Sequence, residues 1–189
     1  APEIKVFAHH GCGVAHCPSS NMRLASGIAP LTAYLRAGVK VGLGVDGSAS
    51  NDSSHMLAEA RQAMLLSRLA AGLAGASLST DDSPPLLTGR QALELATIGG
   101  AKVLGRSDIG ALEAGKCADF ISYDLNRLET AGALHDPVAA LVFCQPHNTD
   151  NTVVHGKFIV KQGQLATLDL HRQIEIHNQA AARLLTGNP

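Results

Sequence analysis

Alternating apolar and small residues run through Val41-Gly42-Leu43-Gly44-Val45-Asp46. In a β-strand, successive side chains point to opposite faces, so the three apolar residues would share one face. The two glycines and then the acid would lie on the other face. We therefore predict a buried strand whose glycines leave room for a ligand and whose C-terminal end presents the carboxylate of Asp46.

Helical periodicity on both sides of this strand, together with a second short strand, predicts an alternating fold. The predicted order is helix 2–10, strand 13–16, polar loop 19–27, helix 30–37, strand 41–45, helix 55–71 and helix 89–104. A Gly/Ala/Ser linker and Asp81–Pro85 mark a break before the last helix. Such alternation is typical of a parallel α/β fold, in which ligands bind where the strands end. His16 and Asp46 end the two strands, so we expect them on the same rim.

The pattern changes after residue 104. The later segments with strand character are 118–124, 152–155, 157–161 and 164–166. Gly156 and Gly163 fall at hairpin positions, which predicts an antiparallel sheet. A closing helix is predicted over residues 170–185. The chain therefore divides, by this prediction, into an α/β part of residues 1–104 and a small β module of residues 105–189.

Composition narrows the class of protein. Hydrophobic residues make up 46% of the chain and charged residues 16%, which predicts a packed core. The net charge of −1 offers no case for nucleic acid or an anionic membrane, and no apolar run is long enough to span a bilayer. The four cysteines contain no Cys-x-x-Cys pair, so we expect reduced thiols in a cytoplasmic protein.

The first residue of the sequence is Ala, and a helical pattern starts at once, without a capping residue before it. We therefore expect a piece of a longer polypeptide.

Two motifs carry a resemblance to a known family. The motifs are Val-Ala-His-Cys-Pro-Ser-Ser-Asn at 14–21 and Val-Gly-Leu-Gly-Val-Asp-Gly at 41–47. In this order they resemble the last two βα units of the TIM-like barrel of the amidohydrolase superfamily. The likeness is to its aminohydrolase branch, and the loops after both strands are most similar to the 8-oxoguanine deaminase and hydroxyatrazine hydrolase group. Segments 110–119 and 154–160 resemble the strands of the small β-sandwich that follows such barrels.

The resemblance implies a metal-dependent hydrolytic deaminase that acts on a purine-like or triazine-like nitrogen heterocycle. In the family, the acid at the end of the eighth strand binds the metal and handles a proton, and Asp46 stands at that position. A divalent ion makes water acidic enough to ionise near a pH of about 7, and a neighbouring carboxylate can move its proton. The implied cofactor is one divalent metal, zinc by default. Its other ligands, the family's histidines on earlier strands, are not in this chain.

Four further residues are candidates for substrate binding, and each has a structural alternative. His16 could instead be a buried structural histidine, Asn21 and Arg23 could stabilise their loop, and Ser48 could cap a helix. The resemblance also implies two partners: the missing N-terminal portion of the barrel and further copies in a homo-oligomer. The fragment alone is expected to be inactive.

The same glycines allow a rival interpretation. Gly42 to Gly47 matches the G-x-G-x-x-G pattern of Rossmann-type dinucleotide-binding proteins. These glycines, however, lie inside the predicted strand, and no helix opens at the third one. Asp46 would also repel a pyrophosphate. A dinucleotide-binding protein and a non-catalytic assembly module are the two alternatives to the deaminase.

Overall fold

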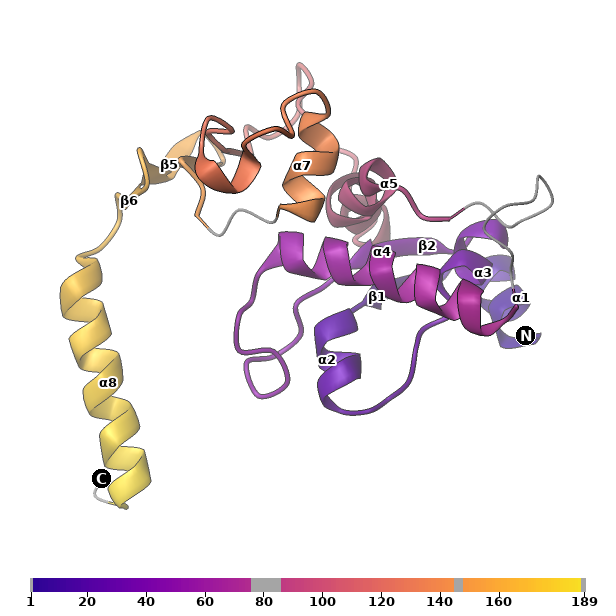
Figure 1. The fold of residues 1–189 in the computed structure, drawn as a ribbon, viewed down its shortest axis with the longest axis horizontal. Coiled ribbons are helices and arrows are strands. Elements are labelled where there is room, and N and C mark those ends of the chain that lie inside the picture. The colour runs from indigo at the N-terminus through magenta and orange to yellow at the C-terminus, as the bar shows by residue number, and fades with distance from the viewer. Residues whose placement is uncertain (1, 76–85, 145–147, 188–189) are drawn as a thin grey trace. The chain divides into compact units, whose positions relative to one another are not determined.

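The computed structural model describes residues 2–75, 86–144 and 148–187, so the predicted break at Asp81–Pro85 lies outside it. The chain divides into two compact units (Figure 1). The first comprises residues 1–116 and 125–147, and the second comprises residues 117–124 and 148–189. Residues 105–116 and 125–147 therefore belong to the first unit. In the described part of the chain, no helix is both long and apolar enough to cross a membrane.

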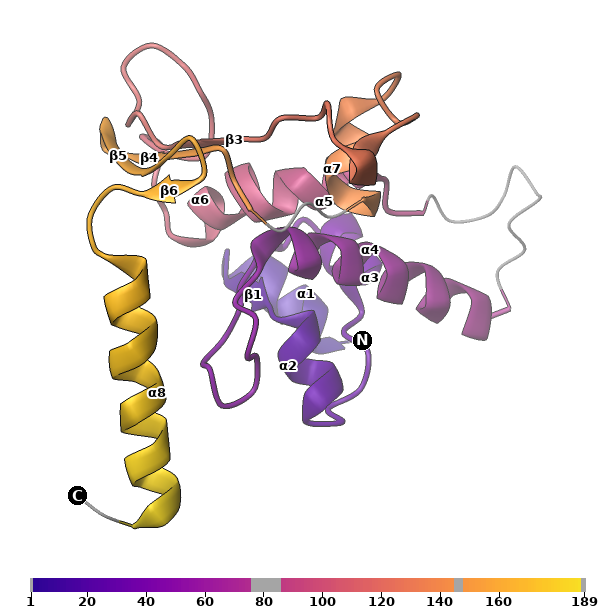
Figure 2. The ribbon, with the colours of Figure 1, turned by 60° about the vertical axis from the view of Figure 1, so that its left-hand side comes forward.

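A parallel pair of strands forms the centre of the first unit. Strands β1 (Gly13–His16) and β2 (Lys40–Leu43) are paired in register from Gly13 and Lys40 to His16 and Leu43. Helix α1 (Pro2–His9) precedes β1, and α3 (Leu31–Arg36) connects the two strands after the short α2 (Pro18–Arg23) (Figure 2). The fold is α/β, as predicted. Strand β2 ends at Leu43, whereas the predicted strand ends at Val45. The Gly44 amide still donates to the His16 carbonyl at 3.0 Å.

Three of the remaining helices of this unit, α4 (Met56–Leu73), α5 (Gly89–Glu94) and α7 (Pro137–Phe143), begin with a side-chain cap. Helix α4 starts at His55, whose Nδ1 accepts from the Ala58 amide at 3.2 Å. Helix α5 starts with a reciprocal capping box between Thr88 and Gln91. It continues through a π-helical turn, η1 (Leu95–Gly99), into α6 (Gly100–Val103), so the helix predicted over residues 89–104 changes type near Gly99 and Gly100. A 3₁₀ turn, η2 (Leu128–Thr130), and α7 complete the unit.

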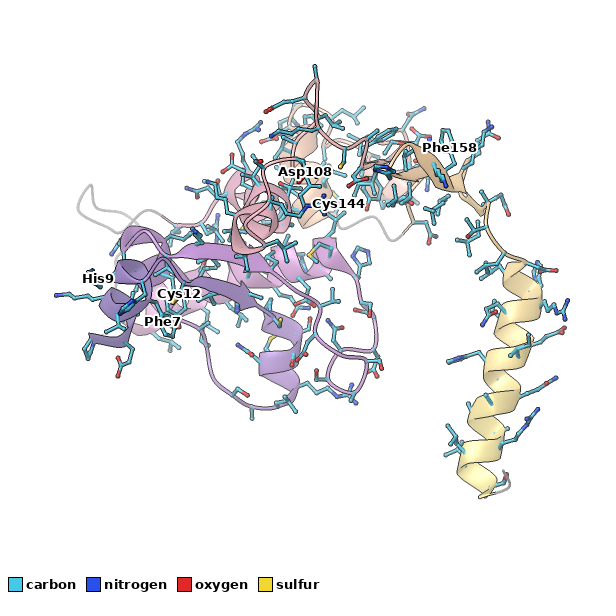
Figure 3. All side chains as sticks on the ribbon, turned by 180° about the vertical axis from the view of Figure 1, so that it is seen from behind. Phe7, His9, Cys12, Asp108, Cys144 and Phe158 are labelled. Carbon is cyan, nitrogen blue, oxygen red and sulfur yellow. The ribbon has the colours of Figure 1, made fainter. Side chains whose placement is uncertain are left out.

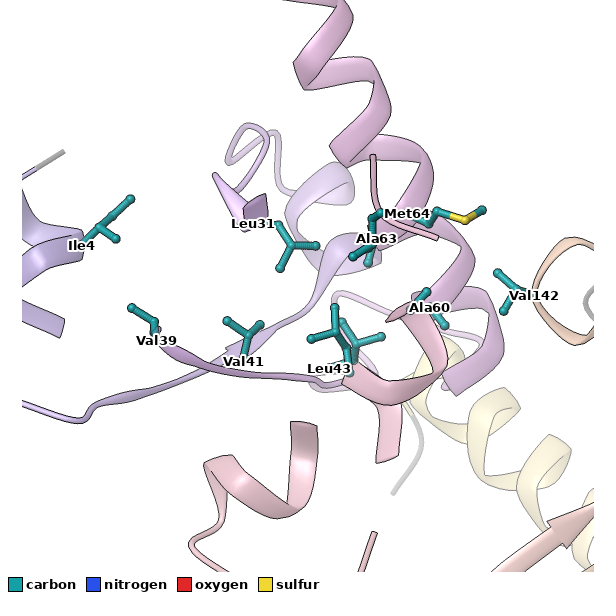
Figure 4. Packing of buried hydrophobic residues seen from close by; sticks show 12 residues of the cluster. Ile4, Leu31, Val39, Val41, Leu43, Ala60, Ala63, Met64 and Val142 are labelled. Atoms are coloured by element: carbon teal, nitrogen blue, oxygen red, sulfur yellow. The ribbon is translucent and has the colours of Figure 1, made fainter. Parts of the chain in front are cut away.

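The apolar face of β2 packs against α4, as predicted. Val41 and Leu43 are 4% and 8% exposed, and they belong to one apolar cluster with Ala60 and Ala63 of the helix (Figure 4). Met64 of α4 is completely buried in the same cluster. This packing removes apolar surface from water, and it fixes which face of the strand is turned away from α4.

The opposite face of β2 differs from the prediction. A Cβ placed on Gly42 would lie 2.8 Å from the Gly100 Cα, and one placed on Gly99 would lie 2.4 Å from the Val41 carbonyl oxygen. Glycine is therefore required because two backbones meet here, and the predicted ligand space at Gly42 is wrong. At Gly44 the nearest neighbour would be the Cys17 sulfur, at 3.0 Å.

A helix also occupies part of the predicted polar loop 19–27. Helix α2 (Pro18–Arg23) follows β1 directly, with Pro18 at its first position. Serine and asparagine are weak helix formers because their side chains compete for backbone hydrogen bonds, so the local sequence does not predict this helix. The contact that supports it comes from elsewhere, because the Ser19 amide donates to the carboxylate of Glu59 in α4 at 3.0 Å.

The second unit contains an antiparallel sheet in the order β3-β4-β5-β6. Its strands are β3 (Phe120–Ser122), β4 (Asn151–Val154), β5 (Lys157–Lys161) and β6 (Gln164–Leu165). The predicted turns at Gly156 and Gly163 are present, with φ values of 76° and 74°. Helix α8 (Leu170–Thr186) follows, capped by Asp169 and ended by Gly187, and none of its side chains is buried.

Candidate functional site

The Asp46 carboxylate lies just beyond the C-terminal end of β2, where three groups donate to it. Ser20 Oγ and Ser50 Oγ donate to Oδ2 at 2.5 and 3.0 Å, and the Gly47 amide donates to Oδ1 at 2.8 Å. The Asp46 backbone has a φ of 62°, in the left-handed region that non-glycine residues rarely adopt. The side chain is exposed but held in one orientation by α2 and by its own loop.

These contacts favour the ionised form of Asp46. The Ser20 hydrogen bond lowers the pKa of the carboxyl most, followed by the Gly47 amide and the Ser50 hydroxyl. Each carboxylate oxygen can accept about two hydrogen bonds. Oδ2 already accepts two and Oδ1 accepts one. An ionised carboxylate with one accessible lone pair on Oδ1 is suited to bind a cation or to accept a proton.

A buried polar network lies behind this rim. Glu59 of α4 is 0% exposed and accepts from the Asn51 side-chain amide at 2.8 Å, in addition to the Ser19 amide. The Asn51 amide also donates to the Val45 carbonyl at 2.8 Å. Buried polar groups are normally satisfied in this way. The network joins α4, α2 and the loop that carries Asp46.

His16 lies at the end of β1 and is only 5% exposed. Burial lowers its pKa below the ordinary value of 6.5, and the nearby Glu59 partly opposes this shift. The histidine is therefore neutral at physiological pH. The structure places it at the same end of the parallel pair as Asp46, but it gives His16 a buried environment beside Glu59.

Arg23 forms an ion pair with Asp52, and both line an open pocket of about 370 Å³. The other lining residues are Ser19, Met22, Ser50, Asn51, Ser53 and Gln62. Asn21 is half-buried in α2, and Ser48 is exposed in the loop after Asp46. The binding of substrate by Asn21, Arg23 and Ser48 stays a prediction.

Sequence reasoning missed three members of this site. Ser20 and Ser50 fall in stretches predicted as polar loop or helix cap, where nothing in the pattern assigns them to Asp46. Glu59 is a charged residue within the predicted helix 55–71, and charged residues are mostly exposed. A usable signal existed, because Glu59 follows Met56 by three positions and precedes Ala63 by four, which places it on the apolar stripe.

A complete metal site is not present in the described ranges 2–75, 86–144 and 148–187. No group of three or more His, Cys, Asp or Glu side chains there could hold a metal ion. His9 and His10 contact one another, with ring centroids 5.1 Å apart. His9, Phe7 and Cys12 lie where α1 leads into β1 (Figure 3). At the candidate site, Asp46 can supply one metal ligand, whereas a catalytic zinc normally has about three protein ligands.

Known proteins resemble this chain over almost its whole length. The chain is 46% identical over 187 residues to an 8-oxoguanine deaminase from Pseudomonas aeruginosa, covering 99% of this chain and 39% of that protein. It is 38% identical to a hydroxydechloroatrazine ethylaminohydrolase from Pseudomonas sp. strain ADP, covering 100% of this chain and 38% of that protein. The chain therefore spans about two fifths of the length of these relatives.

Solved structures show the same fold. A zinc-bound adenosine deaminase from Xanthomonas campestris has a TM-score of 0.86 at 34% identity, covering 98% of this chain and 40% of that one. A zinc-bound atrazine chlorohydrolase from Arthrobacter aurescens has a TM-score of 0.84 at 34% identity, covering 94% of this chain and 38% of that one. The profile of the amidohydrolase family matches residues 1–159. This chain belongs to the amidohydrolase family.

Proposed function

We propose that this chain is the C-terminal part of a hydrolytic deaminase and that Asp46 supplies one ligand to its single divalent metal ion. The observation that carries the proposal is the Asp46 carboxylate, which three donors hold in one orientation while one lone pair on Oδ1 stays accessible. Carboxylate oxygen is a normal ligand of zinc. Zinc-bound relatives support zinc as that ion.

The rest of the metal site would come from an N-terminal portion of the polypeptide. β1 and β2 form a two-stranded parallel sheet in the described residues. Under this proposal they are the last two strands of a (β/α)₈ barrel that residues 1–104 help to close. Within residues 105–189, the antiparallel sheet β3 to β6 forms part of the attached β-sandwich. The assembled enzyme would be a cytoplasmic homo-oligomer.

The chemistry assigned to Asp46 is proton transfer. When bound, a divalent ion makes water acidic enough to provide a hydroxide nucleophile at neutral pH. Asp46 accepts the proton lost from the attacking water and returns it to the leaving amine. A C–O bond forms and the C–N bond breaks. One water proton leaves with the amine as ammonia and the other ends on the adjacent ring nitrogen, so the products are a ring carbonyl beside an N–H group, and ammonia. Ser20, Ser50 and the Gly47 amide keep the carboxylate aimed and ionised between these transfers.

A nitrogen heterocycle with an exocyclic amino group is the proposed substrate class. The relatives that support it are named for 8-oxoguanine and for an ethylamino group on a hydroxylated triazine. Arg23, Asn21 and Ser48 lie on elements that flank Asp46, so we assign them to substrate contact. His16 would act behind the rim, because it is neutral and buried.

Asp46→Asn in the complete polypeptide tests this function. The amide keeps the shape of the side chain but loses the charge and the ability to accept a proton. We expect zinc content to fall and ammonia release from 8-oxoguanine to fall by about 100-fold or more. Glu3→Gln, which neutralises an exposed carboxylate on α1, is the control and should retain both. Unchanged zinc content and unchanged rate in Asp46→Asn would reject the role of Asp46.

A further inference from the structure

A completely buried carboxylate behind the rim has no role in the chemistry described so far. Glu59 lies in the first turn of α4, is 0% exposed, and accepts one hydrogen bond on each oxygen. Burial of a carboxylate in a protein core is unfavourable unless strong hydrogen bonds compensate it. An apolar residue at this position of the stripe would avoid that penalty. The two hydrogen bonds of Glu59 show what the carboxylate holds in place.

The first hydrogen bond leads to the backbone of the Asp46 loop. Glu59 Oε1 accepts from Asn51 Nδ2 at 2.8 Å, and the same amide group donates to the Val45 carbonyl at 2.8 Å. Val45 directly precedes Asp46, whose left-handed φ of 62° must be held by its surroundings. Through Asn51, the Glu59 carboxylate therefore fixes the peptide from which the Asp46 side chain projects.

The second hydrogen bond leads to the hydroxyl that orients Asp46. Glu59 Oε2 accepts from the Ser19 backbone amide at 3.0 Å, which anchors the start of the short helix α2. The next residue, Ser20, donates from its hydroxyl to Asp46 Oδ2 at 2.5 Å. This contact is also the largest cause of the lowered pKa of Asp46. Glu59 is thus connected to Asp46 from two sides, through helix α2 and through the loop that carries Asp46.

We propose that Glu59 is a positioning residue of the active site, which aligns the Asp46 carboxylate by holding its backbone and its serine donor at once. This inference rests on the proposed function, since the alignment affects catalysis only if Asp46 binds the metal. A purely structural Glu59 would change the stability of the protein but not the metal affinity of the folded protein. The two roles therefore differ in a measurable quantity.

Glu59→Gln in the complete polypeptide separates these roles. A glutamine side chain has one acceptor oxygen and one NH₂ group, so the NH₂ group must face either the Ser19 amide or the Asn51 amide, and both are donors. One branch is then lost. We expect the dissociation constant for zinc, measured by chelator competition, to rise by about 10- to 100-fold, because partners that orient metal ligands have effects of this size. We also expect kcat to fall while KM changes little.

Asn51→Ala cuts the branch to Val45 and leaves the Glu59–Ser19 hydrogen bond in place, although it also removes the acceptor of two hydrogen bonds from Ser53. It should weaken zinc binding in the same direction. If Glu59→Gln does not yield folded protein, the zinc affinity of Asn51→Ala decides whether the network positions Asp46. Ser67→Ala is the matched control, since Ser67 is a buried polar residue of the same helix whose hydroxyl donates to the Met64 carbonyl of that helix at 2.7 Å. Ala63→Gly lowers the stability of α4 without touching the network. Both controls should retain the zinc affinity of the unmodified protein.

Zinc affinity in folded Glu59→Gln and Asn51→Ala equal to that of the two controls would overturn the inference. The outcome for Asp46→Asn separates this failure from a failure of the proposed function. If Asp46→Asn loses zinc and Glu59→Gln keeps it, Glu59 has only a structural role. If Asp46→Asn keeps zinc, the metal role of Asp46 is itself rejected.

Discussion

Two titratable side chains at the ends of the parallel strands have lowered pKa values for different reasons. Hydrogen bonds, first of all that from Ser20, lower the pKa of Asp46 because they favour the carboxylate. Burial lowers the pKa of His16 because it disfavours the imidazolium, with Glu59 opposing. At neutral pH the rim therefore carries a carboxylate, and the residue behind it carries no charge. Asp46 keeps its charge well into the acidic range.

The lowered pKa of His16 has a consequence for stability. Below the ordinary pKa of 6.5, the unfolded chain binds a proton that the folded chain resists. The stabilisation is therefore complete above about that pH and is lost as the pH falls towards the folded pKa. His16→Gln should make the decrease in urea midpoint between pH 7.5 and 5.5 smaller. His171→Gln, which removes an exposed histidine of α8, should keep the original decrease, and equal slopes in both variants would contradict the prediction.

At the scale of elements, the decisive contact is the one between β2 and the helical run from η1 into α6. Gly42 and Gly99 let the two backbones meet without side chains between them. The π-helical turn that ends at Gly99 lies at this contact. Because the strand is fixed on this face by backbone and on the other by the core of α4, its end has little freedom to move. The loop that presents Asp46 therefore starts from a rigid point.

A pair of neighbouring glycines tests this contact. Gly99→Ala would place a Cβ 2.4 Å from the Val41 carbonyl oxygen, whereas nothing lies within 4 Å of a Cβ on Gly100. We expect Gly99→Ala to lower the free energy of unfolding by about 1–3 kcal/mol through overpacking. Gly100→Ala should be neutral or stabilising by up to about 1 kcal/mol, because alanine is the better helix former. Denaturant titration followed by circular dichroism measures both, and equal effects would argue against the close approach.

For the molecule as a whole, the proposed function makes this chain one part of a catalytic centre. It matches relatives over nearly its full length but spans only about two fifths of theirs. Asp46 is the one ligand that we assign, and the described residues contain no group of three potential ligands. Asp46, Ser20 and Glu59 all lie in the first of the two units, so the proposed metal binding belongs to that unit.

We expect residues 1–189, produced alone, to retain no zinc after dialysis and to release no ammonia from 8-oxoguanine. The reason is that a single carboxylate ligand does not hold zinc, which requires about three protein ligands. The complete polypeptide should hold zinc in stoichiometric amount and be active. Metal analysis by mass spectrometry and an ammonia assay measure both properties. Stoichiometric zinc in the isolated chain would contradict the assignment of the remaining ligands to another portion.

Local periodicity was sufficient to predict much of the fold. Strand β1, helices α1, α3 and α4, and the hairpins at Gly156 and Gly163 follow from apolar spacing, caps and turn glycines, all of which act over a few neighbouring residues. Asp46 at a strand end was recognised in the same way. Helix α2 was missed because its support is a tertiary contact with Glu59, and serine-rich sequence does not form helices by itself.

The sequence by itself determined the alternation of helices and strands, the antiparallel hairpins and the acid that follows β2, because these depend on spacing along the chain. Only the tertiary structure decided what surrounds that acid. Ser20 and Ser50 donate hydrogen bonds to Asp46, and Glu59 accepts one from the Ser19 amide of α2. Gly42 lies against a helix backbone rather than open space. Such contacts depend on packing between distant segments, and the pattern of one segment does not specify which distant segment it will meet.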